Sequence, residues 1–300
     1  MPFRIQQLSL FLWSLFLIIG LQPVAAVPKA FNRIIQGRDY RDVYDHVYQS
    51  SQSSVACDDT QIQVVIQGIE EAQKLADAAL RVLQVEGVET SQAFHTWFGA
   101  SNANAEFLEK LRNQHYKTAH THLIPPTIPL KISFGSESIE YRVLREGSPS
   151  PGRNSLLYLC ACATSTICEK DDMAFTGTFR AQPQGPTLLT LCNGFFNNRR
   201  LTNAEMVERY QKNINAEQHS KGFIILHELQ HMRKATSPDP KAEDELDPNG
   251  RGGCYSRSCC AHLPDNLKIR NAQNFAYFAL DIIANPESAR PGSEKSSSTS

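Results

Sequence analysis

Apolar side chains recur at helical spacing along two stretches in the first half of the chain. Between Cys57 and Gln84 they follow the period of an α-helix that buries one face. This face consists of Val64, Val65, Ile69, Ala72, Leu75, Ala76, Ala79, Leu80 and Leu83. The stretch from Ala93 to His115 repeats the period more weakly. Because proline does not continue a helix, we predict that this helical part ends before the prolines at 125, 126 and 129.

Beyond residue 130 the pattern changes to short apolar runs separated by Gly and Pro, which is typical of strands. The predicted strands cover residues 132–134, 139–144, 155–161 and 187–196. Helical patterns return at residues 203–215, 221–234 and 266–284. This order predicts an α+β fold with a small twisted sheet. We expect the strand at 187–196 to form the sheet edge, where an extended peptide can pair with the backbone.

The first 26 residues have the pattern of a secretory signal peptide. Arg4 precedes the apolar run Leu8–Leu21, and residues 24–26 offer the small side chains of a cleavage site. The run is shorter than the roughly 20 residues that span a bilayer. We therefore predict a secreted, extracellular protein whose mature chain begins near Val27, with no membrane attachment after cleavage.

The remaining chain divides by composition. Residues 27–56 are polar and predict an arm or a short pro-segment, residues 57–285 predict one domain, and residues 286–300 predict a disordered tail. The 30 Lys and Arg residues balance 31 Asp and Glu residues, so the chain offers no positive field for nucleic acid. We expect the protein to be a monomer.

Eight cysteines all follow the predicted signal peptide: Cys57, Cys160, Cys162, Cys168, Cys192, Cys254, Cys259 and Cys260. An even number in a secreted chain favours disulfides, here up to four. A thiolate zinc site built from residues 160, 162 and 168 is disfavoured, because their spacing is poor and the compartment is oxidising. Eight cysteines allow 105 pairings, and the spacing does not choose among them.

Residues 227–231 read His-Glu-Leu-Gln-His, an HExxH motif within a predicted helix. On a helix, residues four apart share one face, so His227 and His231 can bind the same metal ion. Glu228 cannot join them as a ligand and is instead suited to act as the general base. The motif therefore predicts a zinc site.

A catalytic zinc usually has three protein ligands and one position for water. The HExxHxxGxxH pattern is excluded, because Lys234 and Ser237 stand where it requires Gly and a third His. A carboxylate further along the chain remains, and the candidates are Asp239, Glu243, Asp244, Glu245, Asp247 and Asp265.

Between about Cys57 and Ile283 the chain resembles the fungal aspzincins, which are deuterolysin-type zinc endopeptidases. Four blocks carry the resemblance: the Ala-rich helix after Cys57, the pair LYLC (157–160) and TLCNGFF (190–196), the motif HELQH, and NAQNFAYFA (271–279), which is similar to the family's NADxYAxFA-like final helix. The resemblance implies a zincin-like fold and a secreted peptidase with zinc held by His, His and Asp.

One part of the family pattern does not align with this chain. In the signature GTxDxxYG, Asp binds zinc and Tyr supports the transition state. The nearest match here is around Tyr255, and Gly252 stands where the family has Asp. We therefore predict Asp247 as the third ligand, with Asp244 second. By resemblance, Tyr255 stabilises the oxyanion.

The residues together predict a zinc-dependent endopeptidase that hydrolyses polypeptides, with Zn²⁺ on His227, His231 and Asp247 and Glu228 as the base. An alternative is a secreted zinc-binding or host-interaction protein with little catalysis, and a third is a structural domain without metal. We interpret His120 and His122 as an exposed loop pair, and His219 and His262 as surface residues.

Overall fold

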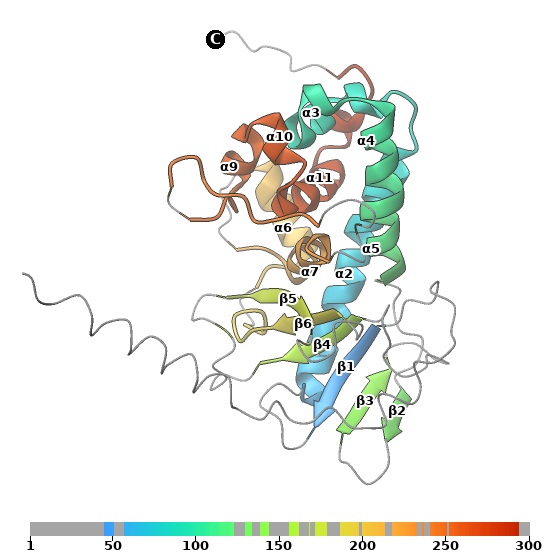
Figure 1. Ribbon diagram of the computed structural model, residues 1–300, viewed down its shortest axis with the longest axis vertical. Coiled ribbons are helices and arrows are strands. Elements are labelled where there is room, and N and C mark those ends of the chain that lie inside the picture. Colours follow the sequence, from blue (N-terminus) through green and yellow to red (C-terminus); the bar gives the residue numbers. More distant parts are fainter. Residues whose placement is uncertain are drawn as a thin grey trace, which may run out of the picture. The chain divides into compact units, whose positions relative to one another are not determined.

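The computed structural model describes residues 45–50, 57–122, 130–133, 139–143, 156–161, 168, 172–178, 187–197, 200–213, 218–232, 236, 241–250 and 252–293. These residues belong to one unit, Asp39–Ser300. Helices and strands are both present, as Figure 1 shows, so the predicted α+β class is confirmed at that level. The predicted signal peptide at 1–26 lies outside the described residues.

The sheet has six strands in the order β2-β3-β1-β4-β6-β5. Their bounds are β1 (Asp45–Ser50), β2 (Leu130–Ser133), β3 (Ile139–Val143), β4 (Leu156–Cys160), β5 (Ala174–Thr178) and β6 (Thr187–Leu191). Strand β4 pairs in parallel with β1 and β6, and the other pairs are antiparallel. The prediction of an edge at 187–196 is wrong, because β6 lies between β4 and β5, and the two edge strands are β5 and β2.

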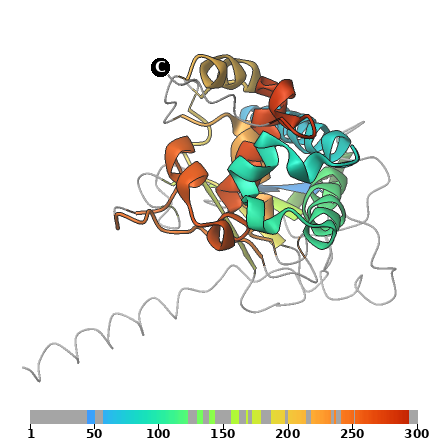
Figure 2. The same cartoon turned by 90° about the horizontal axis from the view of Figure 1, so that it is seen from above.

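The helices occupy the other part of the unit (Figures 1 and 2). The α-helices are α2 (Asp59–Leu83), α3 (Gln92–Phe98), α4 (Ala105–Lys110), α5 (Lys117–His122), α6 (Asn203–Gln211), α7 (Lys221–Gln230), α9 (Arg257–His262), α10 (Asp265–Lys268) and α11 (Ala272–Ala284). Shorter turns are η2 (Val88–Thr90), η3 (Ala100–Asn102), the π-helical η4 (Leu111–Tyr116) and η5 (Pro286–Ala289).

Helix α2 begins where Asp58 and Gln61 form a capping box. Its apolar face packs against α7 at very short range, and two glycines make this possible. A Cβ on Gly222 would lie 2.5 Å from Glu71 Cβ and 2.7 Å from the Ala72 nitrogen, and one on Gly68 would lie 2.9 Å from Ile225 Cδ1. The absence of side chains at both positions lets the two helix backbones approach.

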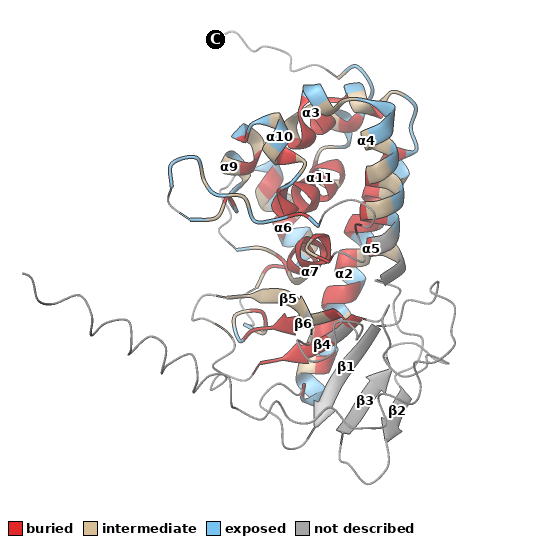
Figure 3. Cartoon of the chain, in the orientation of Figure 1, coloured by how far each residue is buried: buried red, intermediate tan, exposed pale blue. Residues whose placement is uncertain are grey.

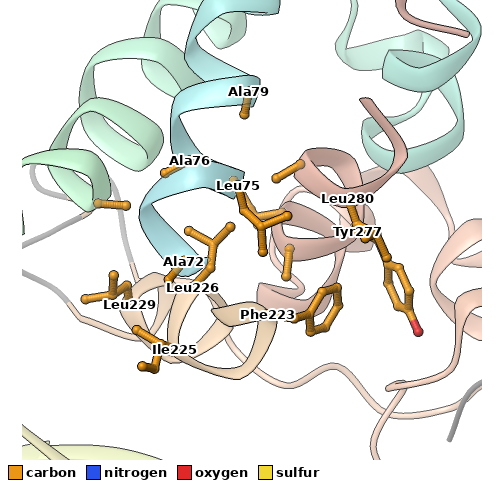
Figure 4. Packing of buried hydrophobic residues seen from close by; sticks show 14 of the residues in the cluster. Ala72, Leu75, Ala76, Ala79, Phe223, Ile225, Leu226, Leu229, Tyr277 and Leu280 are labelled. Carbon is orange, nitrogen blue, oxygen red and sulfur yellow. The ribbon is translucent and has the colours of Figure 1, made fainter. Parts of the chain in front are cut away.

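Helices α7 and α11 are buried along most of their length, as Figure 3 shows in red. Leu75 and Ala76 of α2 and Leu226 of α7 belong to one hydrophobic core with Tyr277 and Leu280 of α11 (Figure 4). The edge strand β5 contacts α7 on another side. The helix that carries the HExxH motif is therefore held between the sheet edge and two other helices.

The predicted long helix from Ala93 to His115 is divided into shorter pieces. Gly99 has a φ of 86°, which ends α3, and Asn104 caps a new helix, α4. The last predicted helix is divided in the same way into α10 and α11, separated by residues 269–271. In the first case Gly99 and Asn104 stand between the apolar positions and break the helix. In the second case Asn271 pairs with Glu243 of a distant loop instead of continuing the helix.

Two predicted boundaries differ from the structure. Residues 45–50 of the predicted arm form β1, which pairs with β3 and β4 inside the sheet. Residues 286–289 of the predicted tail form η5, where Ala289 is buried, and the Ser293 hydroxyl accepts a hydrogen bond from the Gln92 N–H. Residues 294–300 lie outside the described part. Tertiary contacts therefore order segments whose composition favours disorder.

Three disulfides join described residues: Cys57–Cys160, Cys168–Cys192 and Cys254–Cys259. Cys260 is a buried free thiol, and Cys162 lies outside the described residues. The preference for disulfides over a thiolate zinc site at residues 160 and 168 is confirmed. In the part of the chain that the structure describes, no helix is long and apolar enough to cross a membrane.

Candidate metal centre

Helix α7 presents two imidazoles on one face, as the HExxH spacing predicts. Ser220 caps the helix by accepting the Phe223 N–H, and the helix ends at Gln230 with His231 as its C-cap. The Nε2 atoms of His227 and His231 lie 3.1 Å apart, and both side chains are almost fully buried. The two nitrogens therefore converge on one point beside the helix.

A carboxylate oxygen from the loop after α7 reaches the same point. Oδ1 of Asp244 lies 3.3 Å from Nε2 of His227 and 3.3 Å from Nε2 of His231. Backbone hydrogen bonds fix this loop, because the Ala242 N–H donates to the Gln230 carbonyl and the Glu243 N–H donates to the Arg270 carbonyl. Asp244 is thus held between the end of α7 and the start of α11.

The expectation that Asp247 lies beside the two histidines is not met. Its carboxylate accepts hydrogen bonds from the Asn249 N–H and side-chain amide, within a turn of the loop. Residues 246–253 form a hairpin, in which the Asp247 N–H donates to the Gly252 carbonyl and Leu246 bridges to Gly253. This loop projects from the helices in Figures 1 and 2.

Backbone and side-chain acceptors orient the two rings differently. Nδ1 of His231 lies 2.8 Å from the Ala242 carbonyl, which only accepts, so Nδ1 carries the proton and Nε2 is free to bind a cation. Nδ1 of His227 is buried and has no hydrogen-bond partner among the described residues. The side chain of Gln273 on α11 interacts with this ring.

Glu228 points to the same region from the adjacent helical position. Its carboxyl Oε1 lies 3.9 Å from Nε2 of His227, and Oε2 is buried without a hydrogen-bond partner among the described residues. The backbone N–H of Thr176, on the edge strand β5, donates to this carboxylate. Burial raises the pKa of Glu228 to about 7. A carboxyl group with such a pKa can exchange protons near neutral pH.

Tyr255 lies at the rim of the group, 44% exposed. Its hydroxyl hydrogen-bonds to Asp244, and its ring centroid is 6.1 Å from that of His227. Gly253 makes room for the phenol, because a Cβ there would lie 2.3 Å from Tyr255 Cε2. The structure therefore brings Tyr255, which was predicted by resemblance alone, to the site.

The protonation states of His227 and Asp244 favour a cation, whereas that of His231 does not. Burial lowers the pKa of His227 to about 3, and the nearby His231 acts in the same direction. Burial also acts to lower the pKa of His231, but a hydrogen bond to Asp244 and the charge of Glu228 outweigh it and raise that pKa. Burial acts to raise the pKa of Asp244, and the two histidines outweigh it, so this pKa is lowered.

The separations of the three atoms fit zinc. A tetrahedral zinc with ligands at about 2.0–2.1 Å keeps its ligand atoms about 3.3–3.4 Å apart. The three separations here are 3.1, 3.3 and 3.3 Å. His227, Glu228 and His231 also each offer a possible ligand atom, and these three atoms lie within 4.8 Å of one another.

The other histidines are not part of this group. His120 lies 3.9 Å from Asp77, and the exposed His262 hydrogen-bonds to the Ser258 carbonyl. The side chain of His122 lies outside the described residues. The prediction that His219 is a surface residue is not met: the side chain is half-buried and stacks on Phe223, and burial lowers its pKa to about 4.

Sequence reasoning missed several residues next to the site. Buried His115 lies with Nδ1 2.8 Å from Oε1 of Gln230, and Gln273 and Tyr277 of α11 hydrogen-bond to the Tyr255 carbonyl. In the sequence, α11 was recognised by its apolar face, and that pattern gives no indication that its polar residues Gln273 and Tyr277 reach the site. A cavity of about 590 Å³ lined by Trp97, Tyr210 and Arg257 contains none of the motif residues and is separate from the site.

The fold and site define an α+β protein with a candidate HExxH metal centre. No family model and no curated protein matches the chain. Among solved structures the chain is similar to a zinc peptidase from Grifola frondosa, with a TM-score of 0.46 and 16% sequence identity over 76% of this chain and 99% of that chain. Because the similarity is this distant, it assigns no activity to the chain.

Proposed function

We propose that the protein is a zinc-dependent endopeptidase of the deuterolysin type. The observation that supports this most is the convergence of His227, His231 and Asp244 at zinc-like separations, with Glu228 beside them. Zinc bound there would lower the pKa of a water molecule and polarise a peptide carbonyl. Secretion, a polypeptide substrate and a monomeric state are parts of the same proposal.

Asp244 replaces Asp247 as the proposed third ligand, and the hairpin supports this choice. The Cys254 N–H donates to the Glu245 carbonyl at 2.7 Å, so residues 246–253 form an excursion from the path of the chain. Without that excursion, Asp244 stands three positions before Tyr255. This is the spacing of DxxY in the family signature, so the hairpin explains why the motif does not align in the linear sequence.

The chain's own groups would then have distinct roles. Glu228 accepts the proton of the attacking water and delivers it to the leaving amine, for which a pKa of about 7 is suited. Tyr255, whose hydroxyl faces Asp244, donates to the oxygen on which negative charge develops. Both groups lie within the same small region as the proposed ligands.

The edge strand β5 offers a place for the substrate backbone. It is the last strand of the sheet, it contacts α7, and the N–H of Thr176 already points to Glu228. An extended peptide that adds to this edge would lie next to the proposed base. Backbone pairing of this kind is independent of the substrate's side chains.

Zinc binding tests the ligand assignment. We expect about one zinc per purified chain by metal analysis, and loss of that zinc in His227→Ala or His231→Ala. Asp244→Ala should lower zinc affinity sharply, whereas Asp247→Ala, in the same loop, is the matched control and should bind zinc as wild type does. Zinc-free wild-type protein, or equal affinities in the two Asp variants, would contradict the assignment.

The second candidate function is that of a secreted zinc-binding protein without turnover. Its motivation is the cysteine-rich segment near Tyr255 in the chain, which contains the Cys254–Cys259 disulfide and the free thiol of Cys260. Digestion of unfolded casein discriminates between the two. Zinc binding without cleavage of casein or of a peptide library would favour the binding protein.

A further inference from the structure

A cluster of polar side chains near the metal centre joins α11 to Tyr255 and to His219, which precedes the N-cap residue of α7. Nε2 of Gln273 donates to the Tyr255 carbonyl at 2.9 Å, and the Tyr277 hydroxyl donates to the same carbonyl at 3.2 Å. Nε2 of His219 lies 3.2 Å from both Gln273 Nε2 and the Tyr277 hydroxyl. Gln273 is 2% exposed, so its amide is satisfied by protein groups.

The orientation of this amide follows from its partners. A backbone carbonyl only accepts, so the atom facing Tyr255 O has to be the amide nitrogen. That nitrogen also faces Nε2 of His219, which therefore accepts, so the proton of the neutral His219 ring is on Nδ1. Both amide hydrogens are then used, and the one polar atom left on Gln273 is the acceptor Oε1.

One buried donor beside this amide needs an acceptor. If Nε2 of His227 binds a cation, the neutral ring carries its proton on Nδ1. That Nδ1 is buried, and no described acceptor meets it in full hydrogen-bond geometry. Burial lowers the pKa of His227, and hydrogen bonding to the Gln273 side chain acts against this, so Gln273 is the α11 side chain that reaches the ring. The other ring, His231, already has its acceptor in the Ala242 carbonyl.

We propose that Gln273 is a positioning residue for the metal ligand His227, accepting the Nδ1–H of its ring through Oε1 while its amide nitrogen holds the Tyr255 carbonyl. This inference rests on the proposed zinc site. One amide would then set the orientation of a zinc ligand and of the loop that carries Tyr255. Acceptors of this kind fix the tautomer and the direction of a ligating imidazole.

Zinc affinity of three variants, measured with zinc alone by competition with a chelator, tests the proposal. Gln273→Met keeps the length of the side chain but removes the acceptor, and we expect zinc affinity to fall about 10- to 100-fold. Gln273→Glu keeps an acceptor toward His227 and should restore most of this loss. Gln211→Met is the matched control, because Gln211 donates to the Ala284 carbonyl of α11 far along that helix, and it should bind zinc as wild type does.

The outcomes separate this inference from the proposed function. Unchanged zinc affinity in Gln273→Met, or equal losses in Gln273→Met and Gln273→Glu, would overturn the positioning role while leaving the zinc site intact. Failure of the wild type to bind zinc would overturn both. A second measurement needs no variant: in zinc-loaded, ¹⁵N-labelled protein, the His227 Nδ1–H should be protected from solvent exchange, and rapid exchange of this proton would contradict the hydrogen bond.

Discussion

Glu228 is the residue that distinguishes an enzyme from a zinc-binding protein on this scaffold. It lies next to His227 on α7, is 6% exposed, and has a pKa raised to about 7 by burial. At the proposed site, zinc binding by His227, His231 and Asp244 would not require this carboxylate, whereas removal of a proton from water would. The environment of one residue therefore separates the two candidate functions.

Glu228→Gln should retain zinc and lose catalysis. The amide keeps the shape of the side chain but cannot accept the proton, so we expect hydrolysis of casein to fall by about two orders of magnitude or more. Zinc content by metal analysis should stay near that of the wild type. Equal turnover in the variant and the wild type would remove Glu228 from the mechanism.

At the scale of elements, the contact between α2 and α7 sets the position of the motif. Ala in place of Gly in a helix usually stabilises by up to about 1 kcal/mol. At position 222 a Cβ would lie 2.5 Å from Glu71 Cβ and 2.7 Å from the Ala72 nitrogen, which cannot move without shifting α2. The steric cost should therefore exceed the gain in helix propensity.

Gly222→Ala should destabilise the protein by about 1–3 kcal/mol, measured as the free energy of unfolding in denaturant. Gly177→Ala is the control, because a Cβ at Gly177 has no heavy atom within 4 Å, and its effect should stay within about 0.5 kcal/mol. If both variants unfold at the same denaturant concentration, the close approach of α2 and α7 does not constrain the fold.

At the scale of the whole molecule, the Cys57–Cys160 bridge connects the start of α2 to the end of β4. It closes a loop with a sequence separation of 103, against 5 for Cys254–Cys259. A long closed loop restricts the unfolded chain more than a short one does. The bridge between α2 and the sheet should therefore contribute more stability than the one beside Tyr255.

Replacing both cysteines of the 57–160 pair by Ser should lower the free energy of unfolding by about 4–5 kcal/mol, against about 2 kcal/mol for the 254–259 pair. Denaturant unfolding of the two double variants measures this difference. A larger loss in the 254–259 variant would show that local contacts near Tyr255, rather than chain entropy, dominate.

The sequence by itself determined the elements whose evidence is local. The apolar period located α2, α7 and most of α11, and the HExxH spacing placed His227, Glu228 and His231 on one helix, because residues four apart necessarily share a face. The cysteine count indicated disulfides but not their pairing. Strands β5 and β1 are too short and too polar to show a clear apolar pattern, so the same reasoning did not find them.

Only the tertiary structure decided which groups meet α7 from elsewhere. Asp247 was preferred as the closest aspartate before the partial signature match at Gly252 and Tyr255, but it lies in the hairpin at 246–253, whereas Asp244 lies beside the histidines. Gln273 reaches His227 and Tyr255 because α11 packs on α7, a contact between positions that no local period relates. A helical motif is fixed by the geometry of one turn, whereas a loop ligand and its supporting side chains depend on how distant segments pack.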